Sequence, residues 1–173
     1  MFKNIVNKIF TKNQQIDRSE NLYMPCEGFV QDLSDFKKDL KYKNLTNFPG
    51  VNITFDQGKE FLYLYSPLEA KIKFIHECKH TLILQTSNNN NYMLHFGIDI
   101  LRESTEVFQI FVNENQAVTN NDILLSLNLK KLVNKGYYVN LQILLLPDSN
   151  SKNLNIELKN QNLSAHTKVA NIK

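Results

Sequence analysis

Histidine is concentrated in one short stretch of this sequence. Three of the four histidines, His76, His80 and His95, lie in HECKHTLILQTSNNNNYMLHFGID, residues 76–99. Imidazole is the side chain whose ordinary pKa places its charge change between pH 5 and 8, and its neutral form is both a nucleophile and a metal ligand. The cluster therefore predicts chemistry at this place in the chain, and its surroundings must decide which kind.

Three interpretations fit these residue types. A neutral imidazole can attack phosphorus while a second histidine donates a hydrogen bond to the phosphoryl oxygens. At an unperturbed pKa of about 6.5, roughly three-quarters of such a histidine is neutral at pH 7. Alternatively, His76, Cys78, His80 and His95 offer the nitrogen and sulfur ligands that Zn²⁺ prefers. The third interpretation is that these are ordinary strand histidines without a chemical role.

The residues between the histidines predict a β-hairpin. TLILQT (81–86) and YMLHF (92–96) are rich in β-favouring residues, and the asparagines 88–91 would form the tip because asparagine tolerates positive φ.

The predicted register pairs Ser87 with Tyr92 and His80 with Asp99. Residues that are opposed, or two apart on one strand, share a face of a sheet. One face would then carry the following side chains: His76, Cys78, His80, His95 and Asp99. In this register His80 and His95 are about 13 Å apart, at roughly 3.3 Å per residue. Direct contact between them requires a bend, for which Gly97 and the strand break near Lys79 are the candidates.

The chain as a whole predicts an all-β fold. Short apolar or β-branched runs recur between polar breaks: residues 51–55, 60–65, 71–75, 81–86, 92–96, 107–112, 122–127 and 139–146. Many short strands at this spacing are typical of an antiparallel sandwich or barrel. Short helices are predicted only at 33–41 and 128–135, the second ended by Gly136.

The first 21 residues differ from the remainder. An apolar face at helical spacing predicts a short amphipathic helix over residues 1–12, formed by Phe2, Ile5, Val6, Ile9 and Phe10. Lysines lie off that face, and the polar stretch 11–21 follows as a linker. We therefore divide the chain into residues 1–21, an amphipathic segment with its linker, and residues 22–173, the β domain.

Composition narrows the class of protein. A chain of 173 residues with 42% hydrophobic residues has the size of one domain with a substantial core. Its net charge of +3 is too small and too evenly spread to indicate nucleic-acid binding. Two cysteines set no disulfide framework, the start of the chain lacks the features of a secretory signal, and a cytosolic location is the simplest expectation.

Several segments, in order, resemble one family. HFGID (95–99), with another histidine fifteen positions earlier, resembles the glucose-type enzyme IIA domain of the bacterial phosphoenolpyruvate-dependent sugar phosphotransferase system. The resemblance covers most of residues 22–173, and its other matching segments are MPCEGFVQDLSD, FPGVNITF, SPLEAKIKFIHECKH and ENQAVTNND. It implies an antiparallel β-sandwich.

The resemblance also implies a reaction. His95 would accept a phosphoryl group from a histidine-containing carrier protein and pass it to a cysteine of an enzyme IIB domain. His80 would hydrogen-bond the phosphate, Asp99 would orient the site, and no cofactor is needed. The amphipathic residues 1–12 would suit an anionic membrane surface near a membrane-bound partner.

The sequence departs from the family pattern at several positions. Asparagine or alanine replaces glycine at Ala70, Asn115 and Asn121, and Ile100 follows HFGID where the family has threonine. Cys78 stands where a hydroxyl residue often orients the first histidine, and His76 replaces an aromatic residue of the docking surface. These changes motivate the alternative hypothesis of a divergent regulatory or binding module with weak or no phosphoryl transfer.

Overall fold

The computed structural model describes residues 20–36, 43–97 and 104–172 of the chain. The strands in these ranges are β1 (Glu20–Tyr23), β2 (Gly28–Asp32), β3 (Gly50–Thr54), β4 (Phe61–Tyr65), β5 (Ala70–Ile75), β6 (Thr81–Gln85), β7 (Asn91–Phe96), β8 (Phe108–Ile110), β9 (Ala117–Val118), β10 (Ile123–Asn128), β11 (Asn140–Leu145), β12 (Asn155–Ile156), β13 (Gln161–Leu163) and β14 (Lys168–Ile172). The helical pieces are the 3₁₀ turn η1 (Leu33–Phe36) and the helices α2 (Ser104–Val107) and α3 (Leu129–Asn134).

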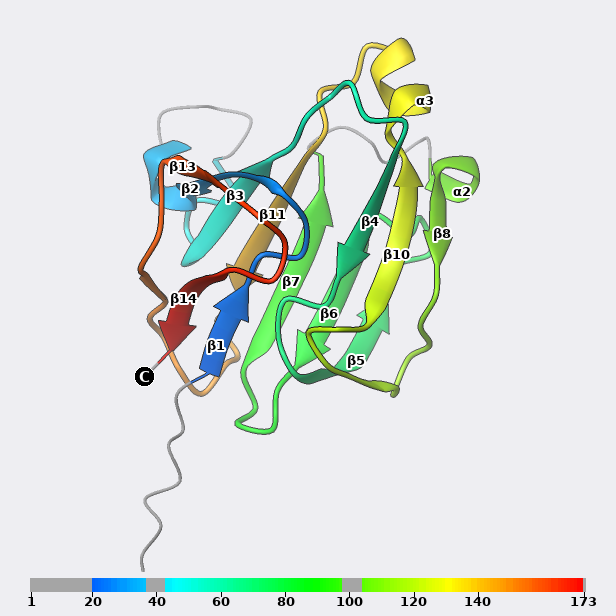
Figure 1. Cartoon of the computed structure of the whole chain (residues 1–173). Coiled ribbons are helices and arrows are strands. Elements are labelled where there is room, and N and C mark those ends of the chain that lie inside the picture. The colour runs from blue at the N-terminus through cyan, green and yellow to red at the C-terminus, as the bar shows by residue number, and fades with distance from the viewer. Residues whose placement is uncertain (1–19, 37–42, 98–103, 173) are drawn as a thin grey trace, which may run out of the picture.

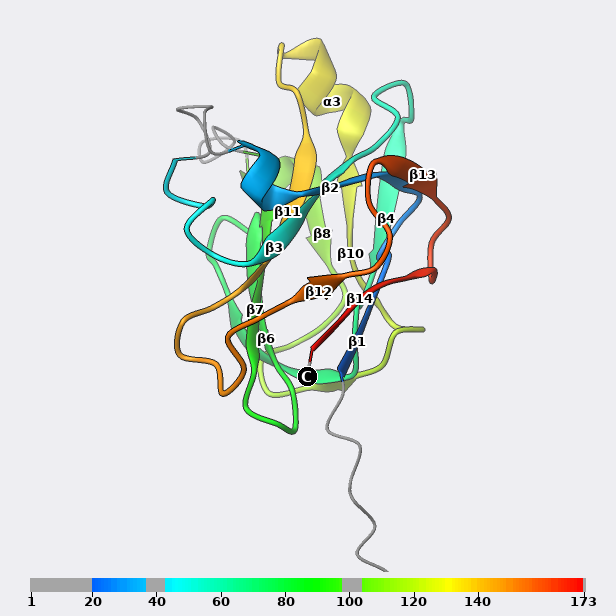
Figure 2. The ribbon, with the colours of Figure 1, turned by 90° about the vertical axis from the view of Figure 1, so that its left-hand side faces the viewer.

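The strands pair antiparallel into three sheets that pack as a sandwich. The largest sheet has the order β13-β2-β3-β11-β7-β6-β5-β9, and the smaller two are β4-β10-β8 and β1-β14-β12. Figures 1 and 2 show β7 and β11 in one layer and β4, β10, β1 and β14 in the facing layer. The predicted antiparallel sandwich is confirmed.

Sequence alternation sets which side of each strand is buried. In β4, Leu62 and Leu64 enter the core, whereas Phe61 and Tyr63 are exposed. This is the two-residue period of a strand with one face on the core. By contrast, every residue of this central strand, β11, is buried, because the main core covers one of its faces and a second cluster formed by Leu33 and Leu144 lies on the other. An almost unbroken apolar run is what such a central strand needs.

All eight predicted strand runs contain a strand. The run 107–112 is shorter than predicted, since Val107 ends α2 and β8 covers Phe108–Ile110. The predicted helix 128–135 is α3, where the Asn128 side chain accepts a hydrogen bond from the Lys131 backbone N–H at 2.9 Å. Of the predicted helix 33–41, Leu33–Phe36 is a 3₁₀ turn, and the remainder lies outside the described residues, as does the amphipathic segment 1–12.

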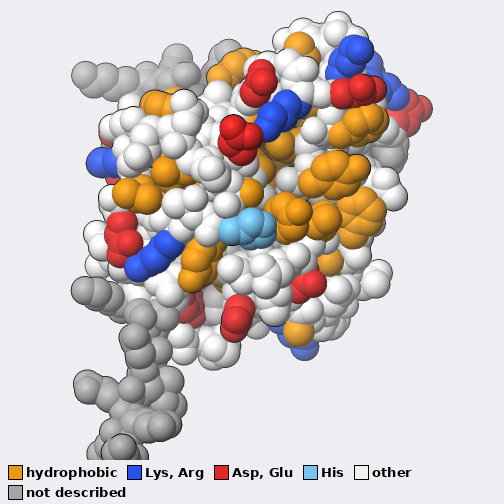
Figure 3. All heavy atoms as spheres, in the orientation of Figure 1, with side chains coloured by type: hydrophobic (Ala, Val, Ile, Leu, Met, Phe, Trp, Pro, Cys, Tyr) orange, Lys and Arg blue, Asp and Glu red, His pale blue; other side chains and the backbone are white. Residues whose placement is uncertain are grey.

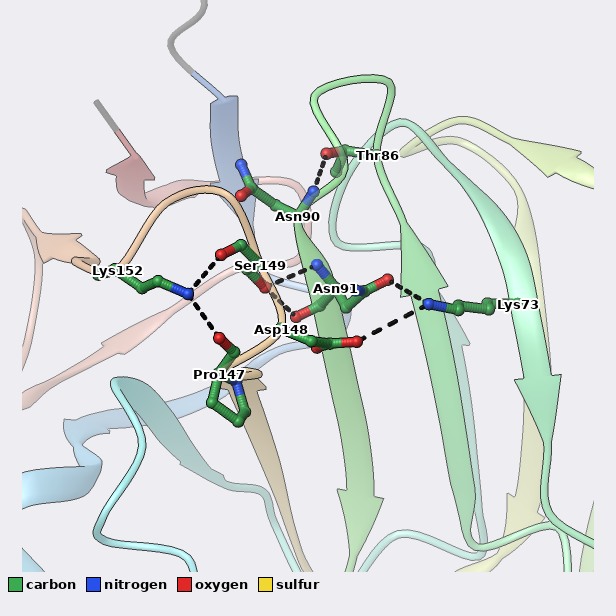
Figure 4. A network of polar contacts seen from close by, with 8 residues as sticks. All are labelled: Lys73, Thr86, Asn90, Asn91, Pro147, Asp148, Ser149 and Lys152. Atoms are coloured by element: carbon green, nitrogen blue, oxygen red, sulfur yellow. Dashed lines mark hydrogen bonds and ion pairs between the residues drawn. The ribbon is translucent and has the colours of Figure 1, made fainter.

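The asparagine-rich turn between β6 and β7 is anchored rather than free. Asn90 and Asn91 are only 1% and 2% exposed. The Asn91 backbone N–H donates to Ser149 Oγ at 2.8 Å, and Ser149 Oγ donates to the Asn91 carbonyl at 3.2 Å (Figure 4). Lys73 Nζ also donates to Asn91 Oδ1 at 3.2 Å. The loop after β11 therefore fixes where β7 begins.

Replacing Asn90 with alanine should destabilise the fold markedly. Its side-chain Nδ2 donates to Glu20 Oε2 at 3.0 Å, and its side-chain Oδ1 accepts from the Ser151 backbone N–H at 2.7 Å. Removing this side chain leaves these partly buried partners without a hydrogen bond, so we expect a loss of about 2–3 kcal/mol in the free energy of unfolding. Urea unfolding measures this, with Ser87→Ala at an exposed neighbouring position as the control. Equal effects of the two variants would show that the network contributes nothing.

Candidate functional site

The β6–β7 pairing places Thr81 directly opposite His95. In the same ladder Leu84 opposes Tyr92, so the predicted register was wrong by three residues. The prediction placed the tip at residues 88–91 and paired Ser87 with Tyr92. In the structure the loop already begins at Thr86, whose N–H donates to the Asn90 carbonyl at 3.0 Å. The anchoring of Asn90 and Asn91 is the physical reason for this difference.

His80 nevertheless reaches His95. It stands immediately before β6, after Lys79, which has a positive φ of 58°. The His80 carbonyl accepts from the Phe96 N–H at 2.9 Å, and the ring centroids of His80 and His95 are 5.3 Å apart. The expected separation of about 13 Å was therefore wrong. The bend near Lys79, which contact was predicted to require, is present, and Gly97 also has a positive φ, of 56°.

His76 extends the pair into a row of three imidazoles. Its ring centroid lies 4.8 Å from that of His80. The turn is tight, because the Lys79 N–H donates to the His76 carbonyl at 2.7 Å and the Cys78 N–H donates to His76 Nδ1 at 3.1 Å. His80, the middle ring, is 3% exposed, whereas the flanking rings of His76 and His95 are half-buried. Solvent and ligands therefore reach the row through its two ends.

One nitrogen of His95 is held by a hydroxyl group. His95 Nδ1 lies 2.9 Å from Thr81 Oγ1. The two atoms can share a hydrogen bond in either direction, according to the tautomer. In the tautomer with the proton on Nδ1, that nitrogen donates to Thr81 and Nε2 carries a free lone pair. This tautomer is the one that a nucleophilic Nε2 requires.

The surroundings keep both central histidines neutral. Burial lowers the pKa of His95 to about 4, and the neighbouring His80 adds to the effect. Burial also lowers the pKa of His80, with a further contribution from His76. Both rings are therefore uncharged near pH 7, and an uncharged imidazole is the nucleophilic form.

The lowered pKa of His95 predicts a loss of stability in acid. The unfolded imidazole takes up a proton near its ordinary value of 6.5, whereas the folded one does so only near 4. Between these values the unfolded state binds more protons, so the free energy of unfolding falls as the pH is lowered, by about 2 kcal/mol at pH 5 for this group. Urea unfolding at pH 8 and pH 5 should show a smaller fall for His95→Gln than for the wild type. An identical fall in both proteins would contradict the assignment.

A row of polar residues continues behind His95. Gln142 pairs with His95 on the other side, and Asn52 pairs with Gln142. Gln142 Nε2 donates to Asn52 Oδ1 at 2.9 Å, yet the buried Gln142 Oε1 has no partner among the described residues. Thr81 and Gln142 were not predicted from the sequence as neighbours of His95. The lone glutamine inside the apolar run 139–146 was the available signal for the second.

The predicted site residues are only partly assembled. His80 and His95 are adjacent, and His76 and Cys78 adjoin His80. The metal-ligand atoms of His76, Cys78 and His80 lie within 4.8 Å of one another, but His95 is not part of that group. The predicted zinc set of four is thus reduced to three. Asp99, the predicted orienter, lies outside the described residues.

Apolar side chains run beside the histidines on the same face of the large sheet. Two residues along from the row of Thr81 and His95, the pairing joins Phe74, Ile83 and Met93. Phe74 is exposed, and the other two are half-buried. The β4 and β10 face also carries hydrophobic side chains, as Figure 3 shows, including the exposed Phe61 and Tyr63 of β4. The first patch shares its sheet face with His95, since Met93 lies two residues before it in β7.

Fold and site together define an antiparallel β-sandwich in which a half-buried histidine contacts a buried one, a class of protein suited to carrying a transferable group. The family model "phosphoenolpyruvate-dependent sugar phosphotransferase system, EIIA 1" matches residues 20–151, and the chain belongs to this family. It is therefore an EIIA component of the phosphotransferase system, which takes up sugars.

Individual relatives agree along almost the whole chain. The glucose-specific EIIA component of Staphylococcus aureus strain COL is 23% identical over 172 residues, which is 99% of this chain and 98% of the relative. That of Staphylococcus epidermidis RP62A is 22% identical over 157 residues, 91% of this chain and 89% of the relative. The structure of glucose permease IIA from Mycoplasma capricolum superposes with a TM-score of 0.73 at 22% identity, covering 91% of this chain and 97% of that one. This likeness supports the fold.

Among the described residues, none of the helices is both long and apolar enough to span a membrane.

Proposed function

We propose that His95 Nε2 accepts a phosphoryl group from the phosphohistidine of a carrier protein and passes it to the cysteine of an enzyme IIB domain. In each step one bond to phosphorus breaks on the donor as another forms on the acceptor, and no cofactor takes part. The observation that carries the proposal is the contact of the His80 and His95 rings, 5.3 Å between centroids, with Nδ1 of His95 held by Thr81.

The roles of the two histidines follow from their surroundings. His95 is half-buried and neutral, so its free Nε2 lone pair can attack phosphorus. His80 is buried beside it, where an N–H group donates to the phosphoryl oxygens and stabilises the charge that passes between donor and acceptor. Thr81 positions the nucleophile. Asp99, in HFGID, is kept as an orienting residue on the strength of the resemblance.

The carrier protein would dock on the apolar row next to the histidines. Phe74, Ile83 and Met93 form a continuous cross-strand row, which lies two residues from His95 along β7. Apolar contact there would exclude water from the transfer and hold the two histidines of donor and acceptor in line.

A phosphorylation assay tests the proposal. The purified chain is incubated with labelled phosphoenolpyruvate and the phosphotransferase donor proteins, and the labelled residue is mapped by mass spectrometry under alkaline conditions. We expect one acid-labile phosphoryl group, on His95. A label on His80 or His166 would overturn the assigned roles. A chain that takes up no label despite an active donor would favour the divergent binding module.

We propose that the amphipathic segment, residues 1–12, brings this chain to its membrane-attached enzyme IIB partner. Residues 1–12 lie outside the described residues, and the division after residue 21 rests on the sequence alone. A lysine-bearing amphipathic helix binds anionic lipid, and proximity to a membrane-attached enzyme IIB on the cytoplasmic side would raise its effective concentration.

Deleting residues 1–15 should abolish binding to anionic vesicles, because the apolar face and lysines are then absent. The full chain should bind such vesicles less tightly as salt is raised. Vesicle co-sedimentation measures both, and phosphorylation by a soluble donor should be the same for the two chains. Equal sedimentation of the full and shortened chains would show that the amphipathic segment does not bind the membrane surface.

A further inference from the structure

The turn between β5 and β6 gathers three metal-binding side chains. One ligand atom from each of His76, Cys78 and His80 lies within 4.8 Å of the other two. His80 Nδ1 is buried and has no hydrogen-bond partner among the described residues. Such an unpaired buried nitrogen is costly in an apolar place, and a ligand that bonds to it would remove that cost.

We propose that His76, Cys78 and His80 bind a zinc ion. Imidazole nitrogen and thiolate sulfur are the donors that Zn²⁺ takes in proteins. The Cys78 thiol releases its proton to solvent as the S–Zn bond forms. The three side chains leave the fourth tetrahedral position to water or to a group from outside the chain.

The turn is already close to the shape that the ion needs. Bond lengths of about 2.0–2.3 Å place tetrahedral ligand atoms roughly 3.3–3.5 Å apart, so the present atoms must close by about 1 Å. Half-buried His76 and Cys78 have room for that rotation. Their backbone is fixed by the bond from the Lys79 N–H to the His76 carbonyl. His76 Nδ1 accepts from the Cys78 N–H, which leaves its Nε2 for the metal.

Neither His95 nor Cys26, the other histidine of the row and the other cysteine of the chain, suits the ion. His95 is not in the group of ligand atoms that lie within 4.8 Å of one another. Cys26 is 3% exposed, and burial raises the pKa of its thiol to about 12. Cys78 is therefore the thiol that can ligate, and Cys26 provides a matched control.

Zinc binding would affect phosphoryl transfer, a consequence that rests on the proposed function. With Nδ1 on the metal, the His80 ring carries its proton on Nε2, the nitrogen that remains to donate to the phosphate. The zinc-loaded chain would therefore keep its phosphate-stabilising donor and would hold His80 in the one tautomer that can donate. A metal-responsive control of this kind depends on His76 and Cys78, two of the positions at which this sequence departs from the family pattern.

Direct binding of metal to the untagged full chain tests the site. We expect one Zn²⁺ per chain by equilibrium dialysis, and a thiolate-to-metal charge-transfer band with Co²⁺ as the spectroscopic probe. Cys78→Ser should abolish that band. Cys78→Ser and His76→Gln should each weaken zinc binding by at least roughly 10-fold, because even the loss of a residue that only supports a metal ligand costs about that much affinity. Cys26→Ser should bind as the wild type does.

Two results would overturn the site. One is zinc content well below one per chain at saturation, and the other is an unchanged affinity in both Cys78→Ser and His76→Gln. The dialysis needs no phosphoryl transfer, so its result stands whether or not His95 is the acceptor. Conversely, phosphorylation measured in a chelator is independent of zinc, and the two proposals can fail separately.

Discussion

Replacing His95 with alanine should abolish phosphoryl acceptance. The proposed nucleophile is Nε2 of this ring, and no other side chain can take its place in the same geometry. His80 is buried beside it, and His76 lies on the other side of His80. We expect the rate of labelling by the phosphorylated carrier to fall by roughly 10³-fold or more, as is usual when a covalent nucleophile is removed.

The measurement is single-turnover labelling by the phosphorylated carrier, with two companion variants. His95→Gln keeps a polar group near Thr81 but has no nucleophilic nitrogen, and it should be equally inactive. His166→Ala is the matched control, since this histidine is exposed and packs on Tyr65, 4.5 Å between ring centroids. It should be labelled as fast as the wild type. Substantial labelling of a folded His95→Ala chain would place the acceptor elsewhere.

The sheet architecture could be predicted because it depends on local pattern. Alternating residues such as those of β4, and the buried apolar run of β11, state which face meets the core without reference to any partner strand. The helix α3 was equally local, with Asn128 at its start and Gly136, at a φ of +86°, just after its end. What such patterns leave open is which residues of two strands oppose one another.

The hairpin register failed for a non-local reason. Asparagine favours turns, so four of them indicated a tip at 88–91, but Asn90 and Asn91 are buried by contacts with residues 149–151 and Glu20. No pattern within the hairpin itself records that contact. Three is an odd number of residues, and side chains alternate between the two faces of a strand. In a regular strand this shift would therefore turn His80 to the opposite face from His95. The positive φ of Lys79 takes His80 out of that alternation and restores the contact.

The contact of His80 with His95 could be predicted before the structure, whereas the neighbours of His95 could not. The pairing of His80 with His95 was implied by the resemblance, whereas the spacing alone gave too long a distance. Thr81 and Gln142 were missed because both depend on the true register, which sets one on each side of His95. Residues that act through a cross-strand partner become visible only when the pairing is known.

Replacing His80 with glutamine should separate acceptance from onward transfer. Glutamine keeps an N–H donor, so the phosphoryl group can still be held as it arrives on His95. It lacks the rigid ring that is held between His76 and His95, so the charge that moves to the enzyme IIB cysteine loses part of its stabilisation. We expect loading to slow by less than about 10-fold and unloading to slow by roughly 10²-fold, the size of one lost electrostatic contact.

Rapid-quench measurements of loading by the carrier and unloading to enzyme IIB, both in a chelator, give the two rates. His80→Ala removes the donor as well and should slow loading too. The His80 ring is buried against both flanking imidazoles, so each variant must first show wild-type unfolding behaviour at pH 8. Wild-type unloading by a well-folded His80→Gln chain would mean that His80 gives no stabilisation to the transferring phosphate. The contact of the two rings would then be packing alone.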